Sequence, residues 1–250
     1  MMTASDETLL FKNSEMVFSR GYIHAGGHFS ACRLLTLANS NSLCSGVTTY
    51  DGCSIESTMK YDEVFIVLGG NVRILWGPEY SRAVEAKFGD VVWLPKGNRV
   101  KYQGEKGIIF YVLYPVDWRT RPEDPQTDGA VGDVRLLKSK DMVYEQMYPE
   151  SGGYGSRCRL ITPDMSKTMG ASMHTYDACS IEWTTHYDQA TVVLDGTLRI
   201  VTGEKFNRVI EAKFGDVIRL PKGTHFKYEG DKAKTFTALY PVDWAARAEK

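Results

Sequence analysis

The chain has 250 residues, of which 43% are hydrophobic, and its 30 Lys and Arg nearly balance 31 Asp and Glu, for a net charge of −1. This composition excludes an intrinsically disordered chain, because enough apolar surface is present to build a core. Basic and acidic residues are interleaved, so the charge does not support nucleic-acid binding, and no apolar run reaches the length of a membrane span.

The start of the chain, residues 1–7, has neither the basic beginning nor the apolar stretch of a signal peptide. We therefore expect a cytoplasmic protein without a membrane partner. The five cysteines include no Cys-x-x-Cys pair, which argues against a zinc ribbon or a redox motif. We expect these thiols to be reduced and mostly buried.

An internal repeat organises the chain. The hexamer Glu-Ala-Lys-Phe-Gly-Asp ends at Asp90 and recurs unchanged ending at Asp216, an offset of 126 residues (216 − 90). A second hexamer, Leu-Tyr-Pro-Val-Asp-Trp, closes both copies at Trp118 and Trp244. Two copies of this length predict two domains, each long enough to bury its own core.

The segment between the copies, residues 119–132, is polar and contains two prolines and two glycines, which is typical of a linker. We therefore predict an N-terminal domain over residues 1–118 and a C-terminal domain over residues 133–250.

Short β-rich segments follow one another within the first copy, separated by turns such as Asp51-Gly52 and Pro95-Lys96-Gly97. The segments are residues 47–50, 54–59, 64–68, 72–76, 91–94 and 108–114. Many short strands with Gly and Pro between them predict an all-β sandwich or barrel. The expected helix content is a short turn at residues 245–249.

Two motifs in each copy resemble those of cupins. The second cupin motif has Gly, five residues, Pro, one residue and Gly, which is matched by Gly89, Pro95 and Gly97 and by Gly215, Pro221 and Gly223. The end of the first motif is matched by Glu63 and Gly70, whereas Gln189 replaces the glutamate before Gly196. The chain thus resembles a bicupin, and each copy resembles the cupin of the ethanolamine-utilisation protein Q type.

This resemblance implies an all-β fold of two tandem cupin barrels, of the double-stranded β-helix or jelly-roll type. It implies that the motif side chains face a ligand pocket at each barrel mouth. It also implies that the two barrels pack as an internal pseudo-dimer, and it leaves further homodimerisation open.

A metal-binding cupin would carry three histidines and one glutamate on these motifs. The second-motif histidine is replaced by Val100 in one copy and Phe226 in the other, so we favour no metal cofactor. The alternative is a divalent metal held by an unusual set in the second copy. That set is His174, Glu182, His186 and His225.

The remaining polar residues of the motifs favour acid–base chemistry. Carboxyl groups that are crowded or buried against apolar walls have raised and separated pKa values, and a neighbouring tyrosine can donate a proton. The candidate catalytic residues are Glu56, Tyr61, Glu63, Glu182, His186 and Tyr187. The candidate pocket residues are Ser57, Met59, Trp93, Val100, Tyr102, Trp183, Thr185, Gln189, Phe226 and Tyr228.

Three functions are consistent with these residues. The preferred one is a cupin enzyme of the lyase, isomerase or cyclase type, doing non-oxidative acid–base chemistry on a small organic molecule. The first alternative is a metal-dependent enzyme, a dioxygenase or a metal-assisted lyase, that uses the histidines of the second copy. The second alternative is a small-molecule-binding protein without catalysis.

Overall fold

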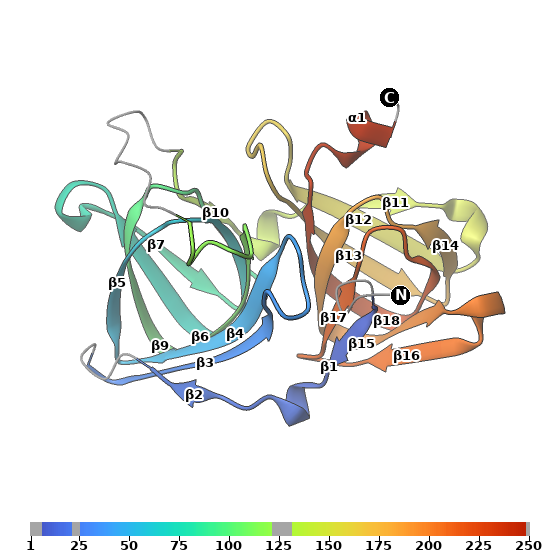
Figure 1. Ribbon diagram of the computed structural model, residues 1–250, viewed down its shortest axis with the longest axis horizontal. Helices are drawn as coiled ribbons and strands as arrows, with labels where there is room; N and C mark the ends of the chain where they lie inside the picture. The colour runs from blue at the N-terminus through green and yellow to red at the C-terminus, as the bar shows by residue number, and fades with distance from the viewer. Residues whose placement is uncertain (1–6, 22–25, 122–131, 249–250) are drawn as a thin grey trace. The chain divides into compact units, whose positions relative to one another are not determined.

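The computed structural model describes residues 7–21, 26–121 and 132–248. These residues divide into two compact units. Residues 17–141 form one unit, the N-terminal barrel. The residues up to 16 and those from 142 onward form the other, the C-terminal barrel. Each unit is a nine-stranded antiparallel sheet, which confirms the prediction of two tandem all-β barrels (Figure 1).

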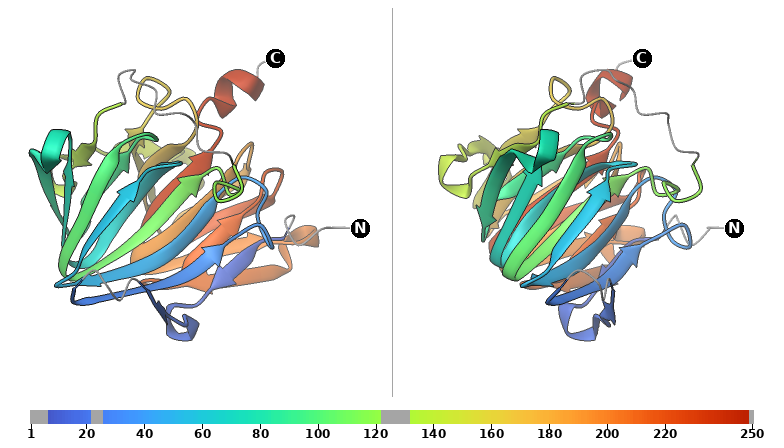
Figure 2. Two further views of the ribbon diagram at one scale, coloured as in Figure 1. Left: turned by 60° about the vertical axis from the view of Figure 1, so that its left-hand side comes forward. Right: turned by 90° about the vertical axis from the view of Figure 1, so that its left-hand side faces the viewer.

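The N-terminal barrel has the strand order β10-β8-β6-β9-β4-β3-β2, with β5 paired to β9 and β7 to β6. Its strands are β2 (Ser19–Arg20), β3 (His28–Leu35), β4 (Cys44–Asp51), β5 (Ser54–Thr58), β6 (Asp62–Trp76), β7 (Arg82–Lys87), β8 (Val91–Leu94), β9 (Arg99–Tyr114) and β10 (Arg135–Leu137). Figure 2 shows the long strands β4, β6 and β9, coloured from blue to green, lying side by side in a curved sheet.

The C-terminal barrel repeats this order as β1-β17-β15-β18-β13-β12-β11, with β14 paired to β18 and β16 to β15. Its strands are β1 (Leu9–Phe11), β11 (Glu145–Met147), β12 (Tyr154–Ile161), β13 (Gly170–Asp177), β14 (Ser180–Thr184), β15 (Asp188–Thr202), β16 (Arg208–Ala212), β17 (Val217–Leu220) and β18 (His225–Tyr240). Over both barrels, the helical elements of the described residues are single turns and one short helix. They are η2 (Asn13–Glu15), η4 (Pro78–Tyr80), η5 (Ser139–Asp141), η6 (Pro149–Ser151), η7 (Glu204–Phe206) and α1 (Trp244–Ala248).

The first strand of each copy joins the barrel of the other copy. Strand β1 pairs with β17, and its counterpart β10 pairs with β8. The predicted domain boundaries assigned both strands to the opposite barrel, and the structure corrects them by this exchange. Each exchanged strand covers the open edge of β17 or β8, which would otherwise expose unpaired backbone groups.

The aspartate that ends the repeated hexamer anchors the exchanged segment. Oδ1 of Asp216 accepts a hydrogen bond from the backbone N–H of Asn13 at 2.8 Å, and Lys12 reaches Oδ2 of Asp216 at 3.1 Å. Oδ1 of Asp90 likewise accepts from the backbone N–H of Ser139 at 2.8 Å. The last residue of the repeated hexamer thus anchors the incoming segment in the same way in both barrels.

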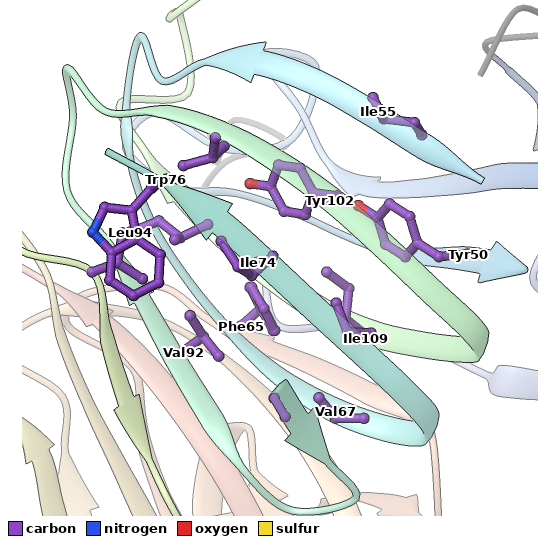
Figure 3. Packing of buried hydrophobic residues seen from close by; sticks show 14 of the residues in the cluster. Tyr50, Ile55, Phe65, Val67, Ile74, Trp76, Val92, Leu94, Tyr102 and Ile109 are labelled. Carbon is purple, nitrogen blue, oxygen red and sulfur yellow. The ribbon is translucent and has the colours of Figure 1, made fainter. Parts of the chain in front are cut away.

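Apolar side chains on alternate strand positions fill each barrel. In the N-terminal barrel the core contains Phe65 and Val67 of β6 and Tyr102 and Ile109 of β9 (Figure 3). The matching core of the C-terminal barrel contains Val193 and Phe226, among others.

The five cysteines are buried and free, as expected. Helix α1 (Trp244–Ala248) confirms the helical turn that was expected over residues 245–249 and begins one residue earlier. Residue 249 lies outside the described part of the chain. Most of the predicted linker, residues 122–131, also lies outside it. Within the described residues, no helix combines the length and apolar character needed to cross a membrane.

Candidate functional site

The N-terminal barrel holds a cavity of about 370 Å³. Strands β3, β4, β5, β6 and β9 and the segment after β9 contribute its walls. Its polar and aromatic lining residues are Phe29, Arg33, Thr36, Cys44, Thr48, Tyr50, Ser57, Tyr61, Glu63, Tyr102, Tyr111, Asp117, Trp118 and Arg119.

Glu63 is the buried carboxyl group of this cavity, with 4% of its surface exposed. Successive side chains of a strand alternate between its faces, so Glu63 shares the inward face of β6 with Phe65 and Val67. Tyr102 donates a hydrogen bond to Oε2 of Glu63 at 3.3 Å. Burial raises the pKa of Glu63 to about 8, against the lowering effect of that hydrogen bond, so the carboxyl group is protonated at neutral pH.

Tyrosines surround Glu63 in the cavity. The rings of Tyr50 and Tyr102 stack with centroids 5.7 Å apart, and Figure 3 shows them next to each other beside Ile55. Burial raises the pKa values of Tyr50, Tyr102 and Tyr111 far above the ordinary tyrosine value. These hydroxyls are therefore neutral hydrogen-bond donors at any physiological pH.

The cavity also carries positive charge. Arg33 and Arg119 both line it, and both lie close enough to Cys44 and Tyr111 to affect their pKa values. Asp117, the other acidic residue of the lining besides Glu63, is paired with Arg121 at 2.8 Å. Burial, opposed by these arginines, raises the pKa of Cys44 to about 11, so this cysteine is a thiol and a poor nucleophile.

The C-terminal barrel holds a larger cavity, of about 530 Å³, with a different lining. Gln189 stands in place of Glu63 and donates a hydrogen bond from Nε2 to the hydroxyl of Tyr228 at 2.6 Å. This cavity therefore lacks the buried acid while keeping the tyrosine beside it.

The structure brings some of the predicted catalytic residues into the cavities and leaves others outside. Tyr61 and Glu63 line the first cavity and Tyr187 lines the second. Glu56 lies on the outer face of β5, because Ile55 and Ser57 take the inward positions on either side of it.

Glu56 is held in an exposed cluster of hydrogen bonds instead. Tyr80 donates to it at 2.7 Å, and Lys101 and Arg99 each lie 2.9 Å from its carboxylate oxygens. These contacts, with that of Tyr80 the largest, lower the pKa of Glu56 to about 2. Glu56 is an ionised surface carboxylate, so the expectation that it shares the barrel mouth with Glu63 is corrected.

Glu182 occupies the equivalent outer position on β14. His225 and Lys227 lie 3.0 and 3.4 Å from its carboxylate oxygens, and despite the opposing effect of burial they lower its pKa. His186 follows the end of β14 at Thr184 and stacks on Trp244 with ring centroids 5.9 Å apart. Glu182 and His186 are therefore not on one strand face, contrary to the assumption behind the predicted metal set.

That metal set is not assembled. His174 lines the cavity, whereas Glu182 and His225 form an exposed pair. Within residues 7–21, 26–121 and 132–248, no three His, Cys, Asp or Glu side chains lie together as metal ligands would. The donor groups present do not fit the metal centre that the fold family implies, and no step of the chemistry is assigned to one.

Some of the predicted pocket residues line a cavity and others do not. Those that line a cavity are Ser57 and Tyr102 in the first barrel and Trp183, Gln189 and Tyr228 in the second. Met59, Val100 and Phe226 belong to the apolar cores, and Trp93 is buried outside the cavity lining. Thr185 is buried at a turn, where its hydroxyl donates to the backbone carbonyls of Tyr187 and Pro221.

Several cavity residues were not predicted from the sequence, namely Arg33, Tyr50, Tyr111, Arg119 and Arg157. Strand alternation could have identified Tyr50, because it shares a face of β4 with Thr48. The arginines give no such signal, because Arg33 and Arg157 lie on strands, where a charged residue usually faces solvent, and Arg119 follows the end of β9.

Comparison with known proteins gives a family match in two segments, one for each copy of the repeat. The family model of the ethanolamine utilisation protein EutQ matches residues 27–120 and 128–246. The chain is 33% identical over 89 residues to the acetate kinase EutQ of Clostridioides difficile (strain 630), a match covering 35% of this chain and 55% of that protein. It is 30% identical over 88 residues to the acetate kinase EutQ of Salmonella typhimurium (strain LT2), covering 35% and 37% respectively. The chain thus spans about half or less of the length of these curated relatives.

Solved structures share the fold at low identity. Protein Ylba from E. coli aligns with a TM-score of 0.71 at 13% identity, covering 96% of this chain and 93% of that one. The oxalate decarboxylase of Lactobacillus farciminis aligns with a TM-score of 0.65 at 14% identity, covering 93% and 85%. With two repeated barrels and a family match over both of them, the chain belongs to the EutQ family of cupins.

Proposed function

We propose that this protein is an acid–base enzyme that acts on a small organic carboxylate in the cavity of the N-terminal barrel. The observation that carries the proposal is Glu63, a buried carboxyl group on a cavity wall, protonated at neutral pH and in contact with Tyr102. A carboxyl group with a pKa near the working pH is suited to give a proton in one step and take one back in the next.

The surroundings of Glu63 support this role. The hydroxyl of Tyr102 hydrogen-bonds the carboxylate that remains after Glu63 has given up its proton. Tyr50 and Tyr111 line the same cavity and are neutral donors that can bind an oxygen atom on which negative charge develops. The reaction type that this set supports is non-oxidative proton transfer, as in a lyase or an isomerase.

The positive charge of the cavity supports an anionic substrate. Arg33 and Arg119 line the cavity, while the carboxylate of Asp117 is paired with Arg121. A guanidinium group binds a carboxylate through parallel hydrogen bonds, which would orient the substrate. The curated relatives carry the name acetate kinase, and acetate is itself a small carboxylate, which agrees with this substrate class.

Deuterium exchange tests proton transfer before the natural substrate is known. The protein is incubated in D₂O with pyruvate or acetoacetate, and NMR follows the loss of the signal of the hydrogens beside the carbonyl group. The wild-type protein should accelerate the exchange over buffer. Glu63→Gln should slow the catalysed exchange about 100-fold or more, the usual range for removal of a general acid–base group.

Two comparisons make the result specific. Glu56→Gln removes an exposed carboxylate of the same barrel and should leave the exchange rate unchanged. Gln already occupies the equivalent position 189 in the other barrel, so Glu63→Gln is compatible with the fold. If carboxylates bind and their deuterium exchange is not accelerated, the protein is a binding protein. Equal exchange rates in wild type and Glu63→Gln would reject Glu63 as the catalytic group.

A further inference from the structure

The cavity of the C-terminal barrel differs from the catalytic one at the positions that determine which ligand it accepts. The buried acid Glu63 is replaced by the neutral amide of Gln189, and Arg119 by Ala245. Since catalysis as proposed above requires the acid, this barrel lacks the group for the same reaction. Its substitutions nevertheless create a new set of binding groups.

The first new feature is a pair of unsatisfied polar side chains. Arg157 of β12 and His174 of β13 are directly opposite each other in the strand register and both line the cavity. Their atoms Nε and Nδ1 are buried and have no hydrogen-bond partner among the described residues. Buried polar atoms are normally paired, so these two are suited to a ligand that enters the cavity.

A guanidinium charge and a neutral N–H donor together favour an anionic ligand. Burial, and next the charge of Arg157, lowers the pKa of His174 to about 3, so the imidazole is neutral and its Nδ1 can donate a hydrogen bond. Arg159 adds a second guanidinium group to the lining. Of the two acidic lining residues, Asp243 is paired with Arg247 at 2.7 Å. Asp164 is the other, so the lining has more arginines than unpaired carboxylates.

The second new feature is an aromatic wall. Trp183 replaces Ser57, and its ring lies 6.0 Å from that of Trp244 and 6.4 Å from that of Tyr148. Tyr187 connects the two features, because its ring lies 5.1 Å from that of Trp244 and its hydroxyl is close enough to Arg157 to be affected by its charge. Aromatic rings arranged at such distances pack well against a planar ligand.

From these contacts we infer that the C-terminal barrel is a separate binding site for an aromatic carboxylate. Arg157 and His174 hold the carboxylate group, and Trp183 and its neighbouring rings hold the ring. The volume of about 530 Å³ leaves room for substituents on that ring. The site lacks the acid of the reaction proposed for the other barrel, since the amide of Gln189 cannot take the place of the Glu63 carboxyl group.

Calorimetry with benzoate tests the inference on the intact protein, with benzamide as a neutral probe of the same shape and acetate as a carboxylate without a ring. Benzoate should bind with a Kd of about 0.1–1 mM, as expected for a ligand of this size. Benzamide and acetate should each bind at least about tenfold more weakly than benzoate. Equal affinity for benzoate and benzamide, or no benzoate binding, would overturn the inference without the need for any variant.

Variants then locate the site. Arg157→Ala and Trp183→Ser introduce the small residues that the other barrel carries at positions 31 and 57, so both are compatible with the fold. Each should weaken benzoate binding about 10- to 100-fold, the effect of losing a charge-assisted hydrogen bond or a stacking partner. The control Arg208→Ala removes an exposed arginine of the same barrel and should have no effect.

Benzoate binding that is lost in Arg33→Ala and retained in Arg157→Ala would place the ligand in the other barrel and reject the inference. Because the readout is binding and not exchange, its outcome is independent of the proposed catalysis at Glu63.

Discussion

The hydroxyl of Tyr102 lies 3.3 Å from Oε2 of Glu63 inside the N-terminal barrel. The equivalent pair in the C-terminal barrel is Tyr228 and Gln189, 2.6 Å apart. The two barrels thus have the same tyrosine and nearly the same side-chain shape beside it, and they differ in whether the partner can carry a proton. This difference makes each barrel the control for the other.

The raised pKa of Glu63 predicts a pH-dependent stability. The folded protein keeps Glu63 protonated up to about pH 8, whereas the unfolded chain releases that proton near pH 4.5. Between these values the folded state binds one more proton, so the free energy of unfolding falls as pH rises, by about 1.4 kcal/mol per pH unit. Urea unfolding of Glu63→Gln from pH 5 to 8 should lack this decrease.

The reciprocal variant supplies the check. Gln189→Glu places a carboxyl group at the matching buried position beside Tyr228. It should add a second decrease of the same sign to the wild-type profile. Parallel profiles for wild type and Glu63→Gln would show that Glu63 is ionised in the folded protein.

The lowered pKa of His174 predicts that the free energy of unfolding changes with pH in the opposite direction at acid pH. Its folded pKa is lowered to about 3 from an ordinary value of 6.5, so the unfolded chain binds the extra proton. The free energy of unfolding should therefore fall as pH drops from about 6.5 toward 3, by up to about 1.4 kcal/mol per pH unit. In His174→Thr, which has the residue of the other barrel, this part of the acid destabilisation should be absent from urea unfolding curves.

Replacing Asp216 or Asp90 with alanine should destabilise the barrel that contains it, to a similar extent in both cases. Each is partly or fully buried and accepts a backbone hydrogen bond from the exchanged segment. Asp216→Ala should destabilise the C-terminal barrel by about 1–3 kcal/mol, because it leaves the N–H of Asn13 without its acceptor. Hydrogen exchange should show faster exchange in β1 and β17, with β8 and β10 unaffected.

Asp90→Ala should give the mirror image, with faster exchange in β8 and β10. Exchange that rises equally in both barrels for either variant would contradict the assignment of each aspartate to its own anchored strand.

The fold could be predicted because the repeat duplicates turn residues whose spacing is specific to cupins. The exchange of β1 and β10 could not, because a three-residue strand carries no sequence signal for which of two similar edges it joins. The family resemblance drew attention to Glu63, which lies in the lining of the cavity.

The error at Glu56 has a simple geometric cause. Glu56 lies on β5 and Glu63 on β6, and the turn between these strands breaks the alternation that relates positions within one strand. Tyr111 would pass for an ordinary core residue in a sequence, since only the assembled barrel shows that it borders a cavity.

The protonation state of Glu63 is measured most directly by NMR titration of the side-chain carboxyl carbons in ¹³C-glutamate-labelled protein. Glu63→Gln assigns the signal by its disappearance. We expect one glutamate to titrate near pH 8, distinct from Glu56, which is expected near pH 2. A Glu63 signal that titrates near pH 4.5 would contradict the assignment of Glu63 as the buried acid of the cavity.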